Sequence, residues 1–307
     1  HMFDIPGYIL QAVQEAGTGS RFVNATEIFV GRGGARTTNN ANEAAHYEFA
    51  AALASDCMLD AMNQVEIGTP EWKLGEALLR RGQHTSLVTI AASGPRFVRG
   101  NMYPTTRTVK LGDAVSLTVG YRGGCSSRCA IAVRNAQELP EGQKDYLQRM
   151  AMPYFAAYAA WMENIRIGMR GGEMFSLIDR ILPHSKYGWS LCPGHLTAEE
   201  EWMSSPIYEN SEETLQSGML LQIDIIPSVP GYTGTCAEGT VLLADSELKA
   251  QIRKHYPDLW ERTEKRRRYI RRELKIDLSE ELLPMGSTVA YLRPFLLAKE
   301  KALCLQK

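Results

Sequence analysis

Two short motifs contain residue types that could do chemistry. Cys125 and Cys129 are spaced CxxxC, which could hold a metal ion, and residues 265–272 form the basic run KRRRYIRR, which could contact phosphate. Neither pattern is specific. Thiols at this spacing more often pack on a strand or loop, and nearby glutamates balance the basic run on what reads as a solvated helix face. A site must therefore be sought among residues that the fold brings together.

The composition limits the classes of protein. The chain has 307 residues, of which 44% are hydrophobic and 22% charged, and its net charge is -1. This balance predicts no attraction to nucleic acid or anionic lipid, and the longest apolar run, around Met219 to Ile226, is far shorter than the roughly 20 residues that cross a bilayer. Six scattered cysteines favour reduced thiols and a cytoplasmic location. We expect a small molecule or short peptide as partner, with no nucleic acid and no membrane.

The elements that would position a site begin after residues 1–38, which read as a linker or as the tail of a missing N-terminal domain. Apolar spacing predicts a long helix from Glu43 to about Val65, capped by Asn42, and a shorter helix over Pro70–Arg81. Strand-like segments follow at Thr85–Ala91, Thr106–Val109 and Ala114–Val119.

The same order of elements recurs later in the chain. A long helix is predicted over Gln143–Ile167 and a shorter apolar helix from Glu173 to Ile181. The Ile167-Gly168 pair between them echoes Ile67-Gly68 between the first two helices. A repeat of this length indicates a duplicated helix-and-sheet half.

The strands of the two halves also correspond. Leu111–Thr118 has a counterpart in Ser217–Asp224. Under a pseudo-two-fold axis, Thr118 and Asp224 would occupy equivalent positions near that axis, where a ligand is expected.

The tail differs from both halves. Glu247–Leu274 reads as one charged helix, and Leu292–Leu305 as a closing strand or hairpin. We expect residues 247–307 to form a C-terminal helix and strand extension packed on a domain of residues 39–246.

Several segments together resemble the pita-bread family of methionine aminopeptidase, aminopeptidase P, prolidase and creatinase. They are Ile67 to Glu71, Leu111 to Asp113, Gly123 to Arg128, Ser217 to Asp224 and Ala237 to Leu243. Each is weak alone, but their order and spacing over residues 38–245 make the resemblance specific. It implies an α+β pita-bread fold, with two pseudo-two-fold-related helix-and-sheet halves around a curved antiparallel sheet.

In that family two aspartates, one histidine and two glutamates hold two divalent ions. The resemblance places Thr118 and Ser127 at the aspartate positions and Gly188 at the metal-histidine position. Asp224 replaces one glutamate, and Glu238 retains the other. Because three neutral side chains replace donors that two cations need, we expect no dinuclear metal site, no metal and no cofactor.

The resemblance leaves a candidate pocket. The resemblance places His184 and His195 at the family's two substrate-binding histidine positions. We take His184, His195 and Glu238 as candidate catalytic residues, and Asp224, Tyr103 and Arg128 as candidate substrate-binding residues. A histidine beside a carboxylate is a general acid or base near neutral pH, so hydrolysis of a C–N bond without metal is chemically feasible. The alternative is that both histidines are loop residues satisfied by neighbouring backbone.

Three functions remain open. The first is an aminopeptidase P/creatinase-like domain without the dinuclear site, which binds a small amino-acid-like or peptide ligand and could hydrolyse it without metal. The second is a non-catalytic peptide- or protein-binding module. The third is an Xaa-Pro-type metallopeptidase with displaced ligands. We expect a homodimer in each case.

Overall fold

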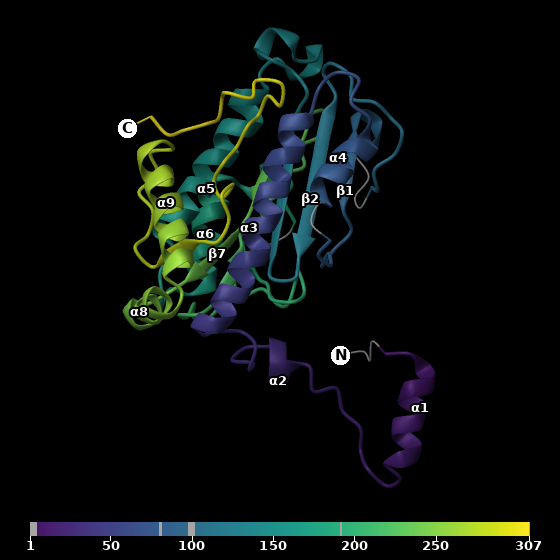
Figure 1. The fold of residues 1–307 in the computed structure, drawn as a ribbon, viewed down its shortest axis with the longest axis vertical. Coiled ribbons are helices and arrows are strands. Elements are labelled where there is room, and N and C mark those ends of the chain that lie inside the picture. The colour runs from purple at the N-terminus through teal and green to yellow at the C-terminus, as the bar shows by residue number, and fades with distance from the viewer. Residues whose placement is uncertain (1–4, 80–81, 98–101, 191, 307) are drawn as a thin grey trace. The chain divides into compact units, whose positions relative to one another are not determined.

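The computed structural model describes residues 5–79, 82–97, 102–190 and 192–306 (Figure 1). Its internal contacts divide the chain into two compact units, His1–Thr37 and Thr38–Lys307. The first unit contains α1 (Gly7–Ala16), which buries none of its side chains, and α2 (Glu27–Val30). In the described part of the chain, no helix is long and apolar enough to cross a bilayer.

The second unit alternates helices and strands. Its helices are α3 (Ala41–Gln64), α4 (Glu71–Leu78), α5 (Met152–Asn164), α6 (Gly171–Ile181), α7 (His184–Tyr187), α8 (Ser246–His255) and α9 (Pro257–Arg272), with helical turns η1 (Gly94–Arg96), η2 (Ala136–Glu138), η3 (Glu141–Gln143) and η4 (Leu147–Ala151). Its strands are β1 (Ile90–Ser93), β2 (Ala114–Tyr121), β3 (Gly124–Ile131), β4 (His195–Leu196), β5 (Leu220–Gln222), β6 (Cys236–Glu238), β7 (Thr240–Leu243) and β8 (Leu282–Pro284).

Two antiparallel four-stranded sheets carry the site. Their strand orders are β1-β2-β3-β6 and β4-β5-β7-β8. Only Gly239 separates β6, which pairs with β3, from β7, which pairs with β5, so one stretch of chain joins the two sheets. Helices α3 and α4 share one buried core with β1 and β2, and α5 and α6 share another with β5 and β7. The predicted α+β arrangement of two helix-and-sheet halves is confirmed.

The turns after the first long helix of each half are built alike. Gly68 N donates to Val109 O at 2.8 Å, and Gly168 N donates to Leu215 O at 2.8 Å. Both glycines have positive φ, of 91° and 86°, which favours glycine over any residue with a Cβ. The Ile-Gly repeat in the sequence therefore marks equivalent turns in the structure.

Helix α3 begins with a capping box. The Asn40 side chain accepts hydrogen bonds from Asn42 N at 2.8 Å and Glu43 N at 3.1 Å, and the Glu43 carboxylate accepts from Asn40 N. The cap is thus Asn40, two residues before the predicted Asn42, because only Asn40 has the extended backbone that aims its side chain at the first turn.

Replacing Asn40 with alanine should lower the free energy of unfolding by about 1 kcal/mol, since two amides of the first turn lose their acceptor. Urea unfolding followed by circular dichroism measures the change. Asn40→Ser keeps a capping oxygen and should lose much less. Equal losses in the two variants would contradict the capping role.

Several predicted elements are shorter in the structure. Of the predicted strand Thr85–Ala91, only Ile90 and Ala91 lie in a regular strand, β1, and Thr85 forms an isolated bridge. The segment Thr106–Val109 forms only an isolated bridge, at Thr108. The helix expected over Gln143–Ile167 is regular only in α5. The expected end of the Pro70–Arg81 helix falls outside the described residues.

The predictions for the tail need two corrections. The prediction of a single helix over Glu247–Leu274 is wrong, because Pro257 keeps Tyr256 out of the helical conformation, at φ -135° and ψ 62°, and divides the segment into α8 and α9. Leu292–Leu305 doubles back, with Leu303 N donating to Leu292 O at 2.9 Å, but forms only an isolated bridge to β3 and no regular strand. Pro294 has no amide hydrogen for a ladder there.

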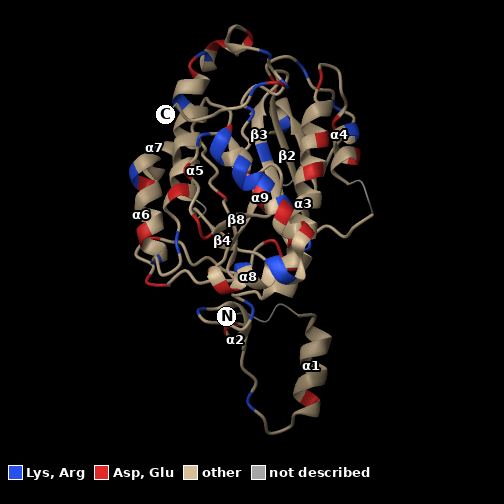
Figure 2. Ribbon diagram, turned by 60° about the vertical axis from the view of Figure 1, so that its left-hand side comes forward, with Lys and Arg blue, Asp and Glu red and all other residues tan. Residues whose placement is uncertain are grey.

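The basic run 265–272 lies on α9 (Figure 2). Arg266 pairs with Glu48 of α3 at 2.8 Å, and both Arg267 and Arg271 pair with Glu280. These three arginines fasten α9 to the rest of the unit, whereas Lys265, Arg268 and Arg272 of the same run are exposed.

Candidate active site

Three neighbouring strands align polar side chains in the first sheet. The register pairs Thr118 of β2 with Ser127 of β3, and Ser127 with Glu238 of β6. The two hydroxyls lie 2.7 Å apart and share a hydrogen bond. Neither hydroxyl carries a charge, so these positions place no anionic donor beside Glu238.

The second sheet supplies a histidine and an aspartate. His195 of β4 pairs with Gln222 of β5, and Asp224 lies two residues beyond Gln222. Thr240 Oγ1 donates to Gln222 Oε1 at 2.9 Å and ties β5 to β7 at this point. The imidazole Nε2 of His195 then lies 3.8 Å from Asp224 Oδ2.

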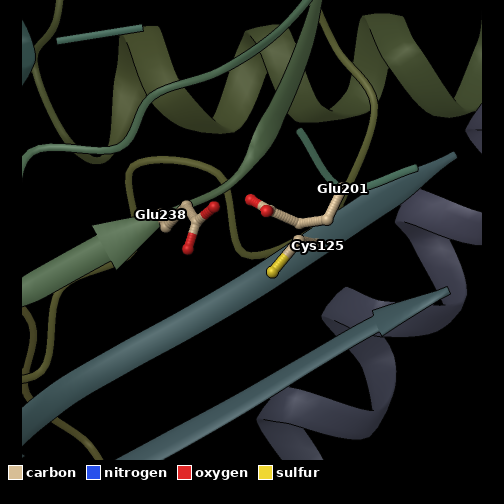
Figure 3. A group of neighbouring side chains, drawn as sticks. All are labelled: Cys125, Glu201 and Glu238. Atoms are coloured by element: carbon tan, nitrogen blue, oxygen red, sulfur yellow. The ribbon is translucent and has the colours of Figure 1, made fainter. Parts of the chain in front are cut away.

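Glu238 belongs to two groups of potential ligand atoms. One group is His195, Asp224 and Glu238, and the other is Cys125, Glu201 and Glu238; within each group the atoms lie within 4.8 Å of one another. Figure 3 shows the Glu201 carboxylate and the Cys125 thiol beside Glu238. Cys125 comes from β3 and Glu201 from the segment after β4, so the cluster unites both sheets. We call these five residues the acidic cluster.

Three buried polar atoms of the acidic cluster have no hydrogen-bond partner among the described residues. They are His195 Nε2, Asp224 Oδ1 and Glu238 Oε1. Glu201 Oε1 lies 3.2 Å from His195 Nε2, a distance for an ion pair but without hydrogen-bond geometry. Buried polar groups are nearly always paired, because leaving one unpaired costs about 1–3 kcal/mol. Three such atoms at one point give the cluster hydrogen-bonding capacity that the described residues leave unused.

The acidic cluster is an unfavourable place for negative charge. Burial raises the pKa of Glu238 well above its usual range, and the neighbouring Asp224 and Glu201 carboxylates raise it further. Burial also raises the pKa of Asp224, to about 6, although His195 opposes the shift. Burial, followed by the nearby carboxylates, raises the pKa of the Cys125 thiol. The cluster therefore favours a proton or a cation.

The acidic cluster is least buried at Glu201, next to the exposed Trp202. His195, Asp224 and Glu238 are at most 5% exposed, whereas Glu201 is partly exposed and Trp202 is 40% exposed. The Trp202 ring stacks on the His195 ring, with centroids 3.9 Å apart and planes 21° apart. The least buried side of the cluster is therefore that of Glu201 and Trp202.

The structure revises the position of the histidine. It places His195 beside Asp224 and Glu238. The family resemblance had instead placed Gly188 at the metal-histidine position. Gly188 ends α7 with a φ of 65°, and a Cβ there would lie 2.3 Å from the Ser228 carbonyl oxygen. The turn requires glycine, so Gly188 has a local structural role.

His184, predicted to be catalytic, lies outside the acidic cluster. Its side chain is 50% exposed and its Nδ1 lies 2.6 Å from Asp179 Oδ1. Its ring contacts those of Phe175 and Trp189. These contacts fix His184 near the surface of α7, and they give it no link to Asp224.

The two other predicted substrate-binding residues also lie outside the cluster. Tyr103 is 64% exposed, and its carbonyl accepts a hydrogen bond from Arg96. Arg128 is buried, and its guanidinium donates to the carbonyls of Ser127, Glu238, Thr288 and Tyr291. Its donors are engaged by backbone, so Arg128 is not available to clamp a substrate carboxylate and instead supports the strand that carries Glu238.

Sequence analysis missed two members of the cluster. Cys125 was considered with Cys129 as a weak metal pair, but Cys129 instead contacts Cys236, with the sulfurs 3.4 Å apart. Period-two spacing from Ser127 along β3 could have placed Cys125 on the same face. Glu201 lies in an irregular segment, where no periodicity identifies it.

The side chains do not fit the pair of metal ions that the family holds. Of the five metal-ligand positions of the family, two are Thr118 and Ser127 in this chain, and their hydroxyls are hydrogen-bonded to each other. A pair of cations needs several carboxylates to offset its charge and to bridge it. The donors His195, Asp224 and Glu238 that remain together are suited to one ion.

Comparisons with known proteins bear on the fold. No protein-family model matches the chain, and no curated protein matches it in sequence. Solved structures do match. The Xaa-Pro dipeptidase from Bacillus anthracis superposes with a TM-score of 0.65 at 20% identity, over 80% of this chain and 68% of that one. The prolidase from Pyrococcus horikoshii gives 0.65 at 20% identity, over 78% and 70%.

The X-Pro aminopeptidase from Thermotoga maritima is also similar, with a TM-score of 0.62 at 15% identity, over 78% of this chain and 68% of that one. At these identities the likeness shows the fold alone. The chain has the pita-bread fold of Xaa-Pro dipeptidases, prolidases and aminopeptidase P, as the sequence predicted.

Proposed function

We propose that this pita-bread protein binds a small amino-acid-like or peptide ligand at the acidic cluster and hydrolyses a C–N bond in it. The observation that carries the proposal is the convergence of three buried, unpaired polar atoms, on His195, Asp224 and Glu238. Structures of similar fold include a dipeptidase and an aminopeptidase that are named for Xaa-Pro substrates. Such buried, unpaired groups are a cost to the fold that function can explain.

The residues present suit C–N hydrolysis. The reaction needs a group that removes a proton from water and a group that delivers one to the leaving nitrogen. Burial raises the pKa of Asp224 to about 6 and that of Glu238 well above its usual range, and His195 presents an unpaired ring nitrogen. The excess of acid would also attract the amino group of an amino-acid-like ligand.

The two histidines allow a matched test, because only one of them lies in the acidic cluster. The purified protein would be screened for release of amino acids from Xaa-Pro dipeptides and small N-linked amides, by mass spectrometry. His195→Gln should lower turnover by at least about 100-fold, since general acid–base groups contribute about 10²–10⁴-fold. His184→Gln should leave turnover within about twofold.

Two results would overturn the proposal. One is the absence of turnover by the wild-type protein on every substrate of the panel, and the other is an equal loss in both histidine variants. Ligand binding that is measured by calorimetry without any turnover would establish the alternative, a non-catalytic binding module. The hydroxyl pair of Thr118 and Ser127, which replaces charged groups, is the feature that favours this alternative.

Location and assembly remain part of the proposal. All six cysteines are free thiols in the structure, which supports the reducing environment of a cytoplasm. We also propose a homodimer, which light scattering of the purified protein tests directly.

A further inference from the structure

We propose that Cys129 and Cys236 form a reversible oxidation site, in which a small hydroperoxide oxidises Cys129 first and the two thiols end as a disulfide between β3 and β6. Neither cysteine belongs to the acidic cluster. The inference uses nothing from the proposed function, and it holds whether or not the protein is a hydrolase.

The fold places the two cysteines directly opposite each other. Cys129 of β3 and Cys236 of β6 are register partners in an antiparallel pair of strands. The Cα atoms of such partners lie about 4.5–5.5 Å apart, which is inside the range of roughly 4.4–6.8 Å that a disulfide spans. The backbone of the two strands therefore already meets the requirement of the bond.

The side chains of the pair are also in contact. The two sulfurs lie 3.4 Å apart. Because a disulfide bond is about 2.0 Å long, each sulfur needs to move by less than about 1 Å, which a small rotation of each side chain provides. Cys236 Sγ also lies 3.5 Å from Ser127 Oγ, and Cys129 Sγ lies 3.6 Å from Ser116 Oγ. The thiols and these two hydroxyls thus form one continuous polar row.

The thiol pair lies on the same face of the first sheet as Glu238. Residues two apart on a strand point to the same face, and Cys129 is two residues from Ser127 as Cys236 is from Glu238. The register pairs Ser127 with Glu238 next to the pair of cysteines. Since β6 is the last strand in the order β1-β2-β3-β6, a disulfide here would fasten the edge strand that carries Glu238.

The burial of the two thiols sets the order in which they react. Cys129 is 9% exposed, whereas Cys236 is 1% exposed. A small oxidant such as hydrogen peroxide therefore meets the Cys129 sulfur first. Cys236 is shielded from solvent and reacts with its neighbour across the strands.

The reaction takes two steps, and its atoms and electrons balance. The Cys129 sulfur attacks one oxygen of hydrogen peroxide, the O–O bond breaks, and the products are a sulfenic acid and one water molecule. The Cys236 sulfur then attacks the sulfenic sulfur, the S–O bond breaks, and the departing oxygen takes the thiol proton and leaves as a second water molecule. The two thiols together lose two electrons and two protons, which the peroxide accepts. A dithiol reductant reverses the change by thiol–disulfide exchange.

Peptide mapping of the folded protein tests the inference. Reduced protein would be treated with hydrogen peroxide, its remaining thiols alkylated, and the chain digested without reduction for mass spectrometry. Trypsin cleaves after Arg128 and separates Cys125 from Cys129, and a glutamyl endopeptidase cleaves after Glu213 and separates Cys192 from Cys236. We expect the peptide of Cys129 linked to that of Cys236, at a mass about 2 Da below the sum of the two thiol peptides. Dithiothreitol should remove the link.

Variants distinguish this pair from the other thiols. Cys236→Ser should abolish the link and leave Cys129 as a sulfenic acid, which a dimedone probe captures. Two controls should keep the link in full. They are Cys57→Ser, at another buried thiol, and Cys304→Ser, at an exposed one.

Four results would overturn the inference. They are a folded wild-type protein that forms no link between Cys129 and Cys236 in excess peroxide, a link that appears only after unfolding in urea, a link that is lost in Cys304→Ser, and a Cys236→Ser variant, folded by circular dichroism, whose Cys129 stays unreacted.

Discussion

Replacing Glu238 with glutamine is expected to lower kcat/KM for the C–N hydrolysis by roughly 10²–10⁴-fold. Glu238 is the residue common to both donor groups, and its Oε1 is buried without a hydrogen-bond partner among the described residues. Glutamine keeps the size of the side chain but can neither accept a proton from water nor balance a cation. The change is measured by steady-state kinetics on the best substrate of the panel.

The same variant separates a catalytic role from a structural one. Removing this buried carboxylate should leave the melting temperature unchanged or raise it, because the charged form of Glu238 is disfavoured by burial. Glu209→Gln, at an exposed carboxylate outside the cluster, is the control and should keep full activity. Wild-type kinetics for Glu238→Gln would rule out its role in the reaction.

Replacing Glu48 with alanine is expected to lower the free energy of unfolding by about 3–5 kcal/mol. Glu48 of α3 is 1% exposed and receives hydrogen bonds from Arg262 Nε at 3.0 Å and Nη2 at 2.6 Å. It also pairs with Arg266, whose guanidinium is 10% exposed and whose pKa burial lowers. Without Glu48 a largely buried cation on α9 loses its counterion. Urea unfolding measures the loss.

A control on the same helix separates buried from exposed ion pairs. Lys265 and Glu261 of α9 pair at 3.2 Å, and both side chains are 66% exposed. Glu261→Ala should change the free energy of unfolding by less than about 1 kcal/mol, because solvent screens this pair. If Glu48→Ala cost no more than Glu261→Ala, the bridge between α3 and α9 would not hold the tail in place.

The sequence predicts the architecture well, because its signals are local. Glycine at Gly68 and Gly168 is dictated by the positive φ of each turn, so the repeat of the two halves is visible in residue types alone. Strand β2 and helix α3 follow from patterns of alternation and helical spacing. The split at Pro257 was also present in the sequence, although the periodicity around it concealed the break.

The candidate site is less predictable, because its members are distant in sequence. Asp224 and Glu238 follow from the correspondence with a known family, but the choice between two histidines does not. Their types and neighbours fit equally well, and only the pairing of β4 with β5 brings His195, and not His184, beside Asp224.

By itself the sequence determined the main helices α3 and α6, the strand β2, the duplication and the neutral residue types at positions 118 and 127, since each depends on residue type and near neighbours. Only the tertiary structure decided that Cys125 and Glu201 lie beside Glu238 and that the Arg128 guanidinium donates its hydrogen bonds to backbone carbonyls. Contacts between residues so far apart along the chain depend on how the two sheets are joined, and no local pattern encodes that junction.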